Sequence, residues 1–291
     1  MIVAASTADS GGRRRFLAPP RDAVAPDCFA QPIYAGLRDF QDLMGAPDWP
    51  SIAALDARLA LPDTHLAEQD EALLADGLHY ETRIAARGRI ATRADNWHDL
   101  FNALIWARYP AIKRALNGQQ CRHIAAMGPG QRNRAQAALT QFDETGVIVR
   151  VRDAALLRAW DRHDWPALFV DGAGQWRNGD IAVAAVIGHA LLEQALLPER
   201  LLVGKCVVVQ GDDDATAVAA VAHAIVDGAL LNDPLELRPL PLAGIPGWHA
   251  QQDALFYRQA AYFRPLREGR VYPAVPGWIH ALRGGSCAQP G

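Results

Sequence analysis

The residues best suited to do chemistry lie on one predicted helix, from Asn96 to Tyr109. Asp95 or Asn96 can cap its N-terminus, and Pro110 follows its end. Successive helix residues are about 100° apart, so one face gathers short polar and aromatic side chains: Asp95, His98, Asp99, Asn102, Trp106 and Tyr109. A solvent-exposed face usually carries Lys, Glu and Arg. This face is therefore predicted to line a pocket.

Within that pocket we assign His98, Asp99 and Asn102 to catalysis, and Trp106 and Tyr109 to substrate binding. Imidazole and carboxylate groups can transfer protons or hold a divalent metal ion that activates water. The alternative interpretation is an ordinary solvent-exposed helix face.

A second pair, His189 and Glu193, lies in a predicted apolar helix over residues 182–197 that ends before Pro198. The two side chains are four residues apart and share one face. Burying either without a partner would be costly. We predict a catalytic acid–base pair or a pair of metal ligands, with a structural hydrogen bond as the alternative. Because buried polar groups need partners, the two stripes are predicted to meet, with His98 and His189 at one site.

Two adjacent carboxylates, Asp143 and Glu144, end a predicted helix over residues 132–142, just before a predicted buried strand over residues 147–151. The C-terminal end of a helix is unfavourable for negative charge, by roughly 0.3–1 kcal/mol. We therefore predict that an arginine or a cation holds them, and we assign both as metal ligands. The alternative is a pair of solvated turn residues.

The stretch from residue 100 to residue 142 contains no Asp or Glu, and its basic residues are Arg108, Lys113, Arg114, Arg122, Arg132 and Arg134. Together with Arg93, assigned to substrate binding, these cations predict a small anionic ligand, phosphorylated in one version of the hypothesis. The alternative is internal pairing with the flanking carboxylates. Nucleic acid is not expected, because base-stacking aromatics are not interleaved with the basic residues.

The remaining elements predict an α+β fold, mostly helical, with a few short strands. Further helices are expected over residues 51–59, 68–78, 111–117, 153–161 and 211–231. Further strands are expected over residues 80–84, 89–92 and 201–209, with a loop over 171–180. The domain organisation is predicted as a loose arm (1–30), one compact globular domain (31–270) whose Pro-rich end wraps around it, and a tail (271–291).

Composition bounds the class of protein. The chain is 50% hydrophobic and 21% charged, with a net charge of -3, which is ordinary for a folded protein. The triplet Arg13–Arg15 suggests an export signal, but a charged, Pro-rich segment follows where an apolar one is needed. No uninterrupted apolar run reaches the ~18 residues that span a bilayer. A cytoplasmic protein without membrane contact is predicted, and the oligomeric state is left open.

Several short strings carry a family resemblance. The most specific is NWHDLFNAL over residues 96–104; others are YETRI at 80–84, GHALxE at 188–193 and GIPGW at 244–248. Together with T-x-FDE-x-G at 140–146, and with FY at 256–257 and FRP at 263–265, they are similar to the bacterial family catalogued as domain of unknown function 3025. The resemblance covers roughly residues 78–268. The family has no established activity, so the resemblance implies none.

Two functional hypotheses follow. In the first, His98, Asp99 and Asn102 face His189 and Glu193 across a pocket, with Asp143 or Glu144 as metal ligands. The reaction would be metal-assisted hydrolysis of an anionic or phosphorylated small molecule. In the second, the same residues form a structural hydrogen-bond network or a non-catalytic ligand pocket.

Overall fold

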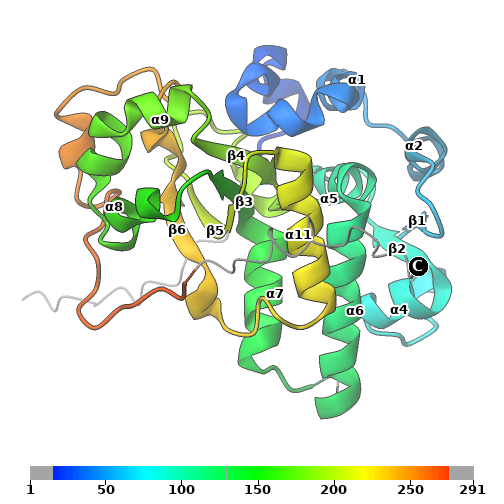
Figure 1. Ribbon diagram of the computed structural model, residues 1–291. Helices are drawn as coiled ribbons and strands as arrows, with labels where there is room; N and C mark the ends of the chain where they lie inside the picture. The colour runs from blue at the N-terminus through cyan, green and yellow to red at the C-terminus, as the bar shows by residue number, and fades with distance from the viewer. Residues whose placement is uncertain (1–15, 129, 275–291) are drawn as a thin grey trace, which may run out of the picture.

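The computed structural model describes residues 16–128 and 130–274, and it confirms an α+β fold (Figure 1). The helices that matter for the site are α4 (Tyr80–Arg87), α5 (Trp97–Arg108), α6 (Pro110–Met127), α7 (Arg134–Thr145), α10 (His189–Gln194) and α11 (Asp214–Val226). Shorter helices are α1 (Gln41–Gly45), α2 (Ile52–Leu59), α3 (Glu71–Leu74), α8 (Leu157–Asp161) and α9 (Ala173–Arg177).

A four-stranded mixed sheet forms the centre of the fold. Its strands are β3 (Gly146–Val151), β4 (Ile181–Val186), β5 (Val203–Gln210) and β6 (Arg238–Pro241), in the order β4-β3-β5-β6. β3 is parallel to β5 and antiparallel to β4. Every residue of β3 is buried, which explains its continuous apolar sequence.

Helices α7 and α11 lie on one side of this sheet, and α6 packs against both of them. The segment from α8 to α9 lies on the other side in Figure 1. A separate two-stranded parallel sheet pairs β1 (His65–Glu68) with β2 (Arg89–Thr92). After β2, a short turn leads the chain into α5.

Helix α5 is buried on nearly all sides, and this burial positions the site. Asn96 caps it, because its Oδ1 atom accepts a hydrogen bond from the Asp99 backbone N–H at 3.1 Å. Its apolar face enters the core, where the Phe101 ring stacks on Tyr34 and Trp97. Its polar face packs against α10 and lines a cavity. The solvent-face interpretation of this helix is therefore wrong.

Three sequence predictions of secondary structure were wrong. Residues 80–84, expected as a strand, belong to α4, whose buried Arg83 and Ile84 follow Tyr80 at helical spacing. The helix expected to stop at Gly118 runs on to Met127, because packing against α11 outweighs the cost of a mid-helix glycine. The apolar run expected as one helix over 182–197 is divided at Gly188 between β4 and α10.

Smaller corrections concern the other boundaries. Of the helix expected over 68–78, only α3 forms, and the predicted loop over 171–180 contains α9. The helix expected over 153–161 begins as a 3-10 turn. The helix expected to reach residue 231 ends at Val226, and the strand expected over 201–209 is β5.

The predicted N-terminal arm is only partly separate from the fold. Cys28 and Phe29 are buried in the core, and the Arg21 guanidinium lies over the rings of Trp49 and Trp97. The chain therefore joins the globular structure earlier than residue 31. The triplet Arg13–Arg15, and the tail beyond residue 274, lie outside the described residues. In the described ranges, no helix is both long and apolar enough to cross a membrane.

Candidate metal centre

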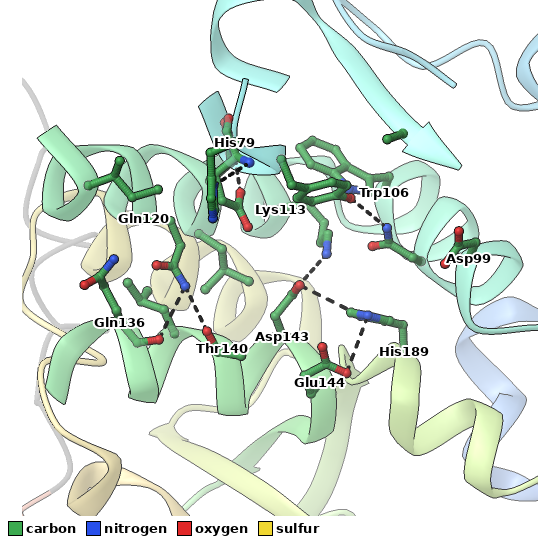
Figure 2. A pocket seen from close by; sticks show the side chains of 18 of the residues that line it. His79, Asp99, Trp106, Lys113, Gln120, Gln136, Thr140, Asp143, Glu144 and His189 are labelled. Atoms are coloured by element: carbon green, nitrogen blue, oxygen red, sulfur yellow. Dashed lines mark hydrogen bonds and ion pairs between the residues drawn. The ribbon is translucent and has the colours of Figure 1, made fainter. Parts of the chain in front are cut away.

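A cavity of about 340 Å³ opens between α4, α5, α6, α7 and α10 (Figure 2). Its wall is mostly polar, with carboxylates, amides, two histidines near one end and a few aliphatic side chains. The size is that of a small-molecule site. Eight of the ten predicted site residues line it: Arg93, His98, Asp99, Asn102, Trp106, Asp143, Glu144 and His189.

The predicted meeting of the two histidines is confirmed. The Nε2 atoms of His98, from α5, and His189, from α10, are 3.0 Å apart. Their rings lie nearly edge to face, with centroids 4.4 Å apart. Glu193 does not pair with His189 on its own helix; its carboxylate lies 3.1 Å from the Nδ1 atom of His98.

Both carboxylates at the end of α7 face His189. The Glu144 carboxylate is 3.7 Å from the Nε2 atom of His189, and the Asp143 carboxylate is 3.9 Å from its Nδ1 atom. Figure 2 shows Asp143 between His189 and the ammonium group of Lys113, with which it forms an ion pair. The cation that holds Asp143 is therefore Lys113 and not an arginine, and the alternative of a solvated turn residue does not fit Asp143.

One donor atom from each of His98, His189 and Glu144 lies within 4.8 Å of the other two. Two nitrogens bound to tetrahedral zinc, with bonds of about 2.0–2.1 Å, lie about 3.3 Å apart. The His98–His189 separation of 3.0 Å is close to that value. Glu144 thus completes a set of three donors, two imidazoles and one carboxylate, of a kind that zinc enzymes use. Asp143, predicted as a ligand, is instead placed behind His189.

The proton positions on the two rings are constrained. If the Nδ1 atom of His98 donates to Glu193, a neutral His98 has only a lone pair at Nε2. His189 would then have to donate from Nε2, and its Nδ1 lone pair would face the Asp143 carboxylate. Two arrangements avoid that repulsion: a second proton on His98, or a metal ion between the two Nε2 atoms.

Burial and charge separate the two imidazoles. Burial lowers the pKa of His98, but the hydrogen bond with Glu193 and the charge of Glu144 outweigh it, so the pKa is raised. Burial lowers the pKa of His189 to about 3, and the charge of Asp143 offsets this only in part. His189 is thus neutral at pH 7, the form in which imidazole binds a metal.

The carboxylates are tuned in opposite directions. Burial raises the pKa of Asp143, but the charge and hydrogen bond of Lys113, together with the two nearby histidines, outweigh this and the pKa is lowered. Burial raises the pKa of Glu144, and the negative charge of Asp143 adds to the effect although His98 opposes it. A cation at the three-donor set would relieve this desolvation of Glu144.

Arg93 and Asp99 form a closed pair at the edge of the cavity. The Arg93 guanidinium donates two hydrogen bonds to Asp99, at 3.0 and 2.7 Å, and its backbone N–H donates a third at 2.6 Å. Asp99 is therefore committed to holding the turn between β2 and α5. Its contacts with Arg93 support a structural role, and its predicted catalytic role stays a prediction.

Tyr109 does not join the other predicted residues. It lines a different cavity beside Gly36, and its non-helical backbone (φ -129°, ψ 55°) caps the next helix instead of continuing α5. The helical projection that grouped it with His98 therefore fails at this residue.

Sequence reasoning missed several residues of the wall. Lys113 was only counted among the basic residues, although it is one of two lysines in the chain. Tyr80 and Glu81 were hidden by the wrong assignment of α4 to a strand. In the structure, Glu81 accepts a hydrogen bond from Asn117 at 2.7 Å, and burial raises its pKa. The other polar residues not predicted are Gln69, His79, Asn117, Gln120, Gln131, Gln136 and Thr140.

Comparison with known proteins places the chain in a family. The model of the family described as "Protein of unknown function (DUF3025)" matches residues 64–267, well over half of the chain. The chain belongs to this family. Every residue that lines the cavity falls inside the DUF3025 match. Searches of curated proteins and of solved structures gave no match.

Proposed function

We propose that the protein is a metal-dependent hydrolase acting on a polar small molecule. The observation that carries the proposal is the convergence of the His98 and His189 Nε2 atoms, 3.0 Å apart, with the Glu144 carboxylate in the wall of a cavity. A divalent ion of the zinc type, bound by these three residues, would keep one position for water. A bound ion lowers the pKa of water toward 7 and supplies hydroxide at neutral pH.

Two carboxylates support the proposed ligands from behind. Glu193 fixes the His98 ring through Nδ1, so that Nε2 presents its lone pair to the ion. Asp143 stands in the corresponding place behind His189, whose Nδ1 atom is buried and has no hydrogen-bond partner among the described residues. Such partners orient metal-binding histidines and raise their basicity.

In the proposed reaction, a divalent ion held by His98, His189 and Glu144 would activate water for attack on the carbonyl or phosphoryl centre of the substrate. The water would supply the oxygen of the new bond, the bond to the leaving group would break, and a proton from that water would pass to the leaving group. Lys113 lines the cavity with its ammonium group paired with Asp143, so its part in the proposal is to hold that carboxylate behind His189.

The prediction that the ligand is anionic has weaker support from the structure. Arg93 and Lys113 line the cavity but are each paired with a carboxylate. The third basic residue, Arg132, belongs to the exposed part of the wall. An anionic group on the substrate would therefore be bound chiefly by the metal ion itself.

The second candidate function is a non-catalytic ligand pocket. It is favoured by the arrangement in which a doubly protonated His98 closes the hydrogen-bond network without a metal ion. In that case divalent ions would leave the protein unaffected.

The test begins with metal analysis of the purified protein, followed by EDTA treatment and thermal-shift titration with Zn²⁺, Co²⁺, Mn²⁺ and Mg²⁺. The proposal expects near-stoichiometric metal, a rise in Tm on re-addition, and turnover of a model ester or phosphoester panel. Replacing His189→Gln or Glu144→Gln should abolish the Tm rise. His223→Gln, on the exposed face of α11, is the matched control and should keep it. Absence of a metal response in the unaltered protein would overturn the proposal.

A further inference from the structure

Two buried polar atoms of α5 have no hydrogen-bond partner among the described residues. They are the Oδ1 atom of Asn102 and the Nε1 atom of Trp106. The residues are 9% and 3% exposed, and both line the cavity. Burying a polar group without a hydrogen-bond partner destabilises the folded protein. Such a pair in a cavity wall marks a place where a ligand completes the hydrogen bonds.

Asn102 has one hydrogen-bond partner in the cavity wall. Its Nδ2 atom donates a hydrogen bond to the hydroxyl oxygen of Tyr80 at 3.0 Å. In this orientation the carbonyl oxygen, Oδ1, is the acceptor that has no partner among the described residues. The indole N–H of Trp106 is a donor only. The two residues therefore offer one acceptor and one donor.

Helix geometry places these two groups side by side. Asn102 and Trp106 are four residues apart on α5, so they are neighbours on one face. A ligand that satisfies both must present an N–H and a C=O on the same side. Primary carboxamides, lactams, ureides and some nucleobase edges have this arrangement. A trans peptide bond does not, since its N–H and C=O point in opposite directions.

The same helix fixes the distance to the proposed metal. His98 precedes Asn102 by one turn and Trp106 by two, which is about 6 and 12 Å along the axis. The amide-binding pair therefore lies too far along α5 to hold the bond that is cleaved at the metal. Leu116, Ile124 and Leu139 supply apolar wall in the same cavity.

From these observations we infer that Asn102 and Trp106 form a recognition subsite for an amide edge of the ligand, with N–H and C=O on one side. Resting on the proposed function, the substrate is a small molecule whose scissile bond lies at the metal and whose carboxamide or lactam group lies one to two helix turns away. Tyr80 is a positioning residue that holds the Asn102 amide in the required orientation.

The test uses EDTA-treated protein, so that its outcome does not depend on the metal proposal. Benzamide is the probe, and methyl benzoate is the comparison compound, because it keeps the carbonyl and ring but lacks the N–H donors. Binding is followed by the indole N–H signals of the eight tryptophans in NMR spectra. The Trp106 signal is identified by its absence in Trp106→Phe. Benzamide should shift this signal, and methyl benzoate should bind about 5-fold more weakly.

The variants test each hydrogen bond. Trp106→Phe and Asn102→Leu should each weaken benzamide binding by about 5-fold, and Tyr80→Phe should reduce the preference for benzamide over methyl benzoate. Trp165→Phe is the matched control: Trp165 is also 3% exposed, but its Nε1 atom already donates to the Arg264 carbonyl at 2.8 Å. It should lower the Tm and leave the ratio of the two affinities unchanged.

Trp106→Phe removes a donor that has no acceptor among the described residues, so the Tm of this variant should stay unchanged. Equal binding of the two compounds, or a Trp106 signal that benzamide does not move, would overturn the inference. If the EDTA-treated protein prefers benzamide over methyl benzoate but its Tm does not respond to added metal, the proposed function is wrong and the amide subsite still holds.

Discussion

His98 and His189 are separated by 91 residues in the chain, yet their Nε2 atoms are 3.0 Å apart. Each ring has a carboxylate near its other nitrogen, Glu193 for His98 and Asp143 for His189. The symmetry is incomplete, because the Glu193 contact is a hydrogen bond and the Asp143 contact, at 3.9 Å, is not. This difference allows the two carboxylates to be tested separately.

Glu193→Gln should weaken Zn²⁺ binding by about 10- to 100-fold, because the amide cannot supply the negative charge that makes His98 a stronger ligand. The hydrogen bond to Nδ1 can persist through the Gln carbonyl, so the Tm of the metal-free protein should change little. Isothermal titration calorimetry with Zn²⁺ measures the effect. Glu199→Gln, at an exposed position in the segment between α10 and β5, is the control. Equal affinity in both variants would contradict a supporting role for Glu193.

Lys113→Met should destabilise the protein by about 3 kcal/mol, because it leaves the Asp143 carboxylate without its cation. Adding Asp143→Asn should recover much of that loss, since the uncompensated charge is removed. Urea unfolding of the two single variants and the double variant gives the coupling energy. Additive single effects would show that the pair is not coupled.

Part of the site could be predicted from the sequence because it depends on local periodicity. His98, Asn102 and Trp106 were grouped by their spacing on one helix, and all three line the cavity. His189 was predicted at the same site because buried polar groups need partners, and it also lines the cavity. The partner of Glu193 was not predictable in this way. Its carboxylate sits on α10 with His189 but contacts His98, which depends on the packing of α10 against α5.

Other parts depend on tertiary structure from the start. The apolar run before Gly188 is compatible with either a helix or a buried strand, and pairing with β3 decides for β4. The Lys113 side chain on α6 is only 4% exposed. Its burial depends on Asp143, which faces it from α7 and supplies the opposite charge. No local pattern distinguishes such a lysine from a surface one.

Acid stability should depend on Asp76, which receives two hydrogen bonds from the buried Arg83 guanidinium, at 2.9 and 2.7 Å. These bonds lower the pKa of Asp76 from 3.8 to about 2. The carboxylate therefore contributes stability that is complete above pH 3.8 and is lost as the pH falls through about 2. Asp76→Asn should flatten the pH dependence of the free energy of unfolding in this window. An unchanged slope would show that the contact is not maintained in solution.

Gly118→Ala should stabilise the protein by about 0.5–1 kcal/mol, because Gly118 lies inside α6 and loses more backbone entropy on folding than alanine does. A Cβ atom at this position would meet nothing within 4 Å. Thermal unfolding should show a higher Tm, with metal and benzamide binding unchanged. A lower Tm would mean that this helix face is occupied in solution.

Gly188→Ala is expected to damage the proposed metal centre although Gly188 is not itself one of the proposed ligands. Gly188 caps α10, and its φ of -66° suits alanine, so the backbone conformation is not the obstacle. A Cβ atom there would lie 2.5 Å from the Thr145 Cα atom and 2.7 Å from the Glu144 carbonyl oxygen. Both are backbone atoms at the end of α7, so they cannot move aside as a flexible side chain would.

Helix α10 would have to shift away from α7, and the shift would separate His189 from Glu144, whose donor atoms are 3.7 Å apart. We expect Gly188→Ala to lose about 1–3 kcal/mol of stability and most of its Zn²⁺ affinity. Gly174→Ala, in α9, is the matched control, because its Cβ atom would meet nothing within 4 Å. Zn²⁺ titration and urea unfolding of both variants check this. If Gly188→Ala bound Zn²⁺ normally, the close approach of α10 to α7 would not be what sets the distance between His189 and Glu144.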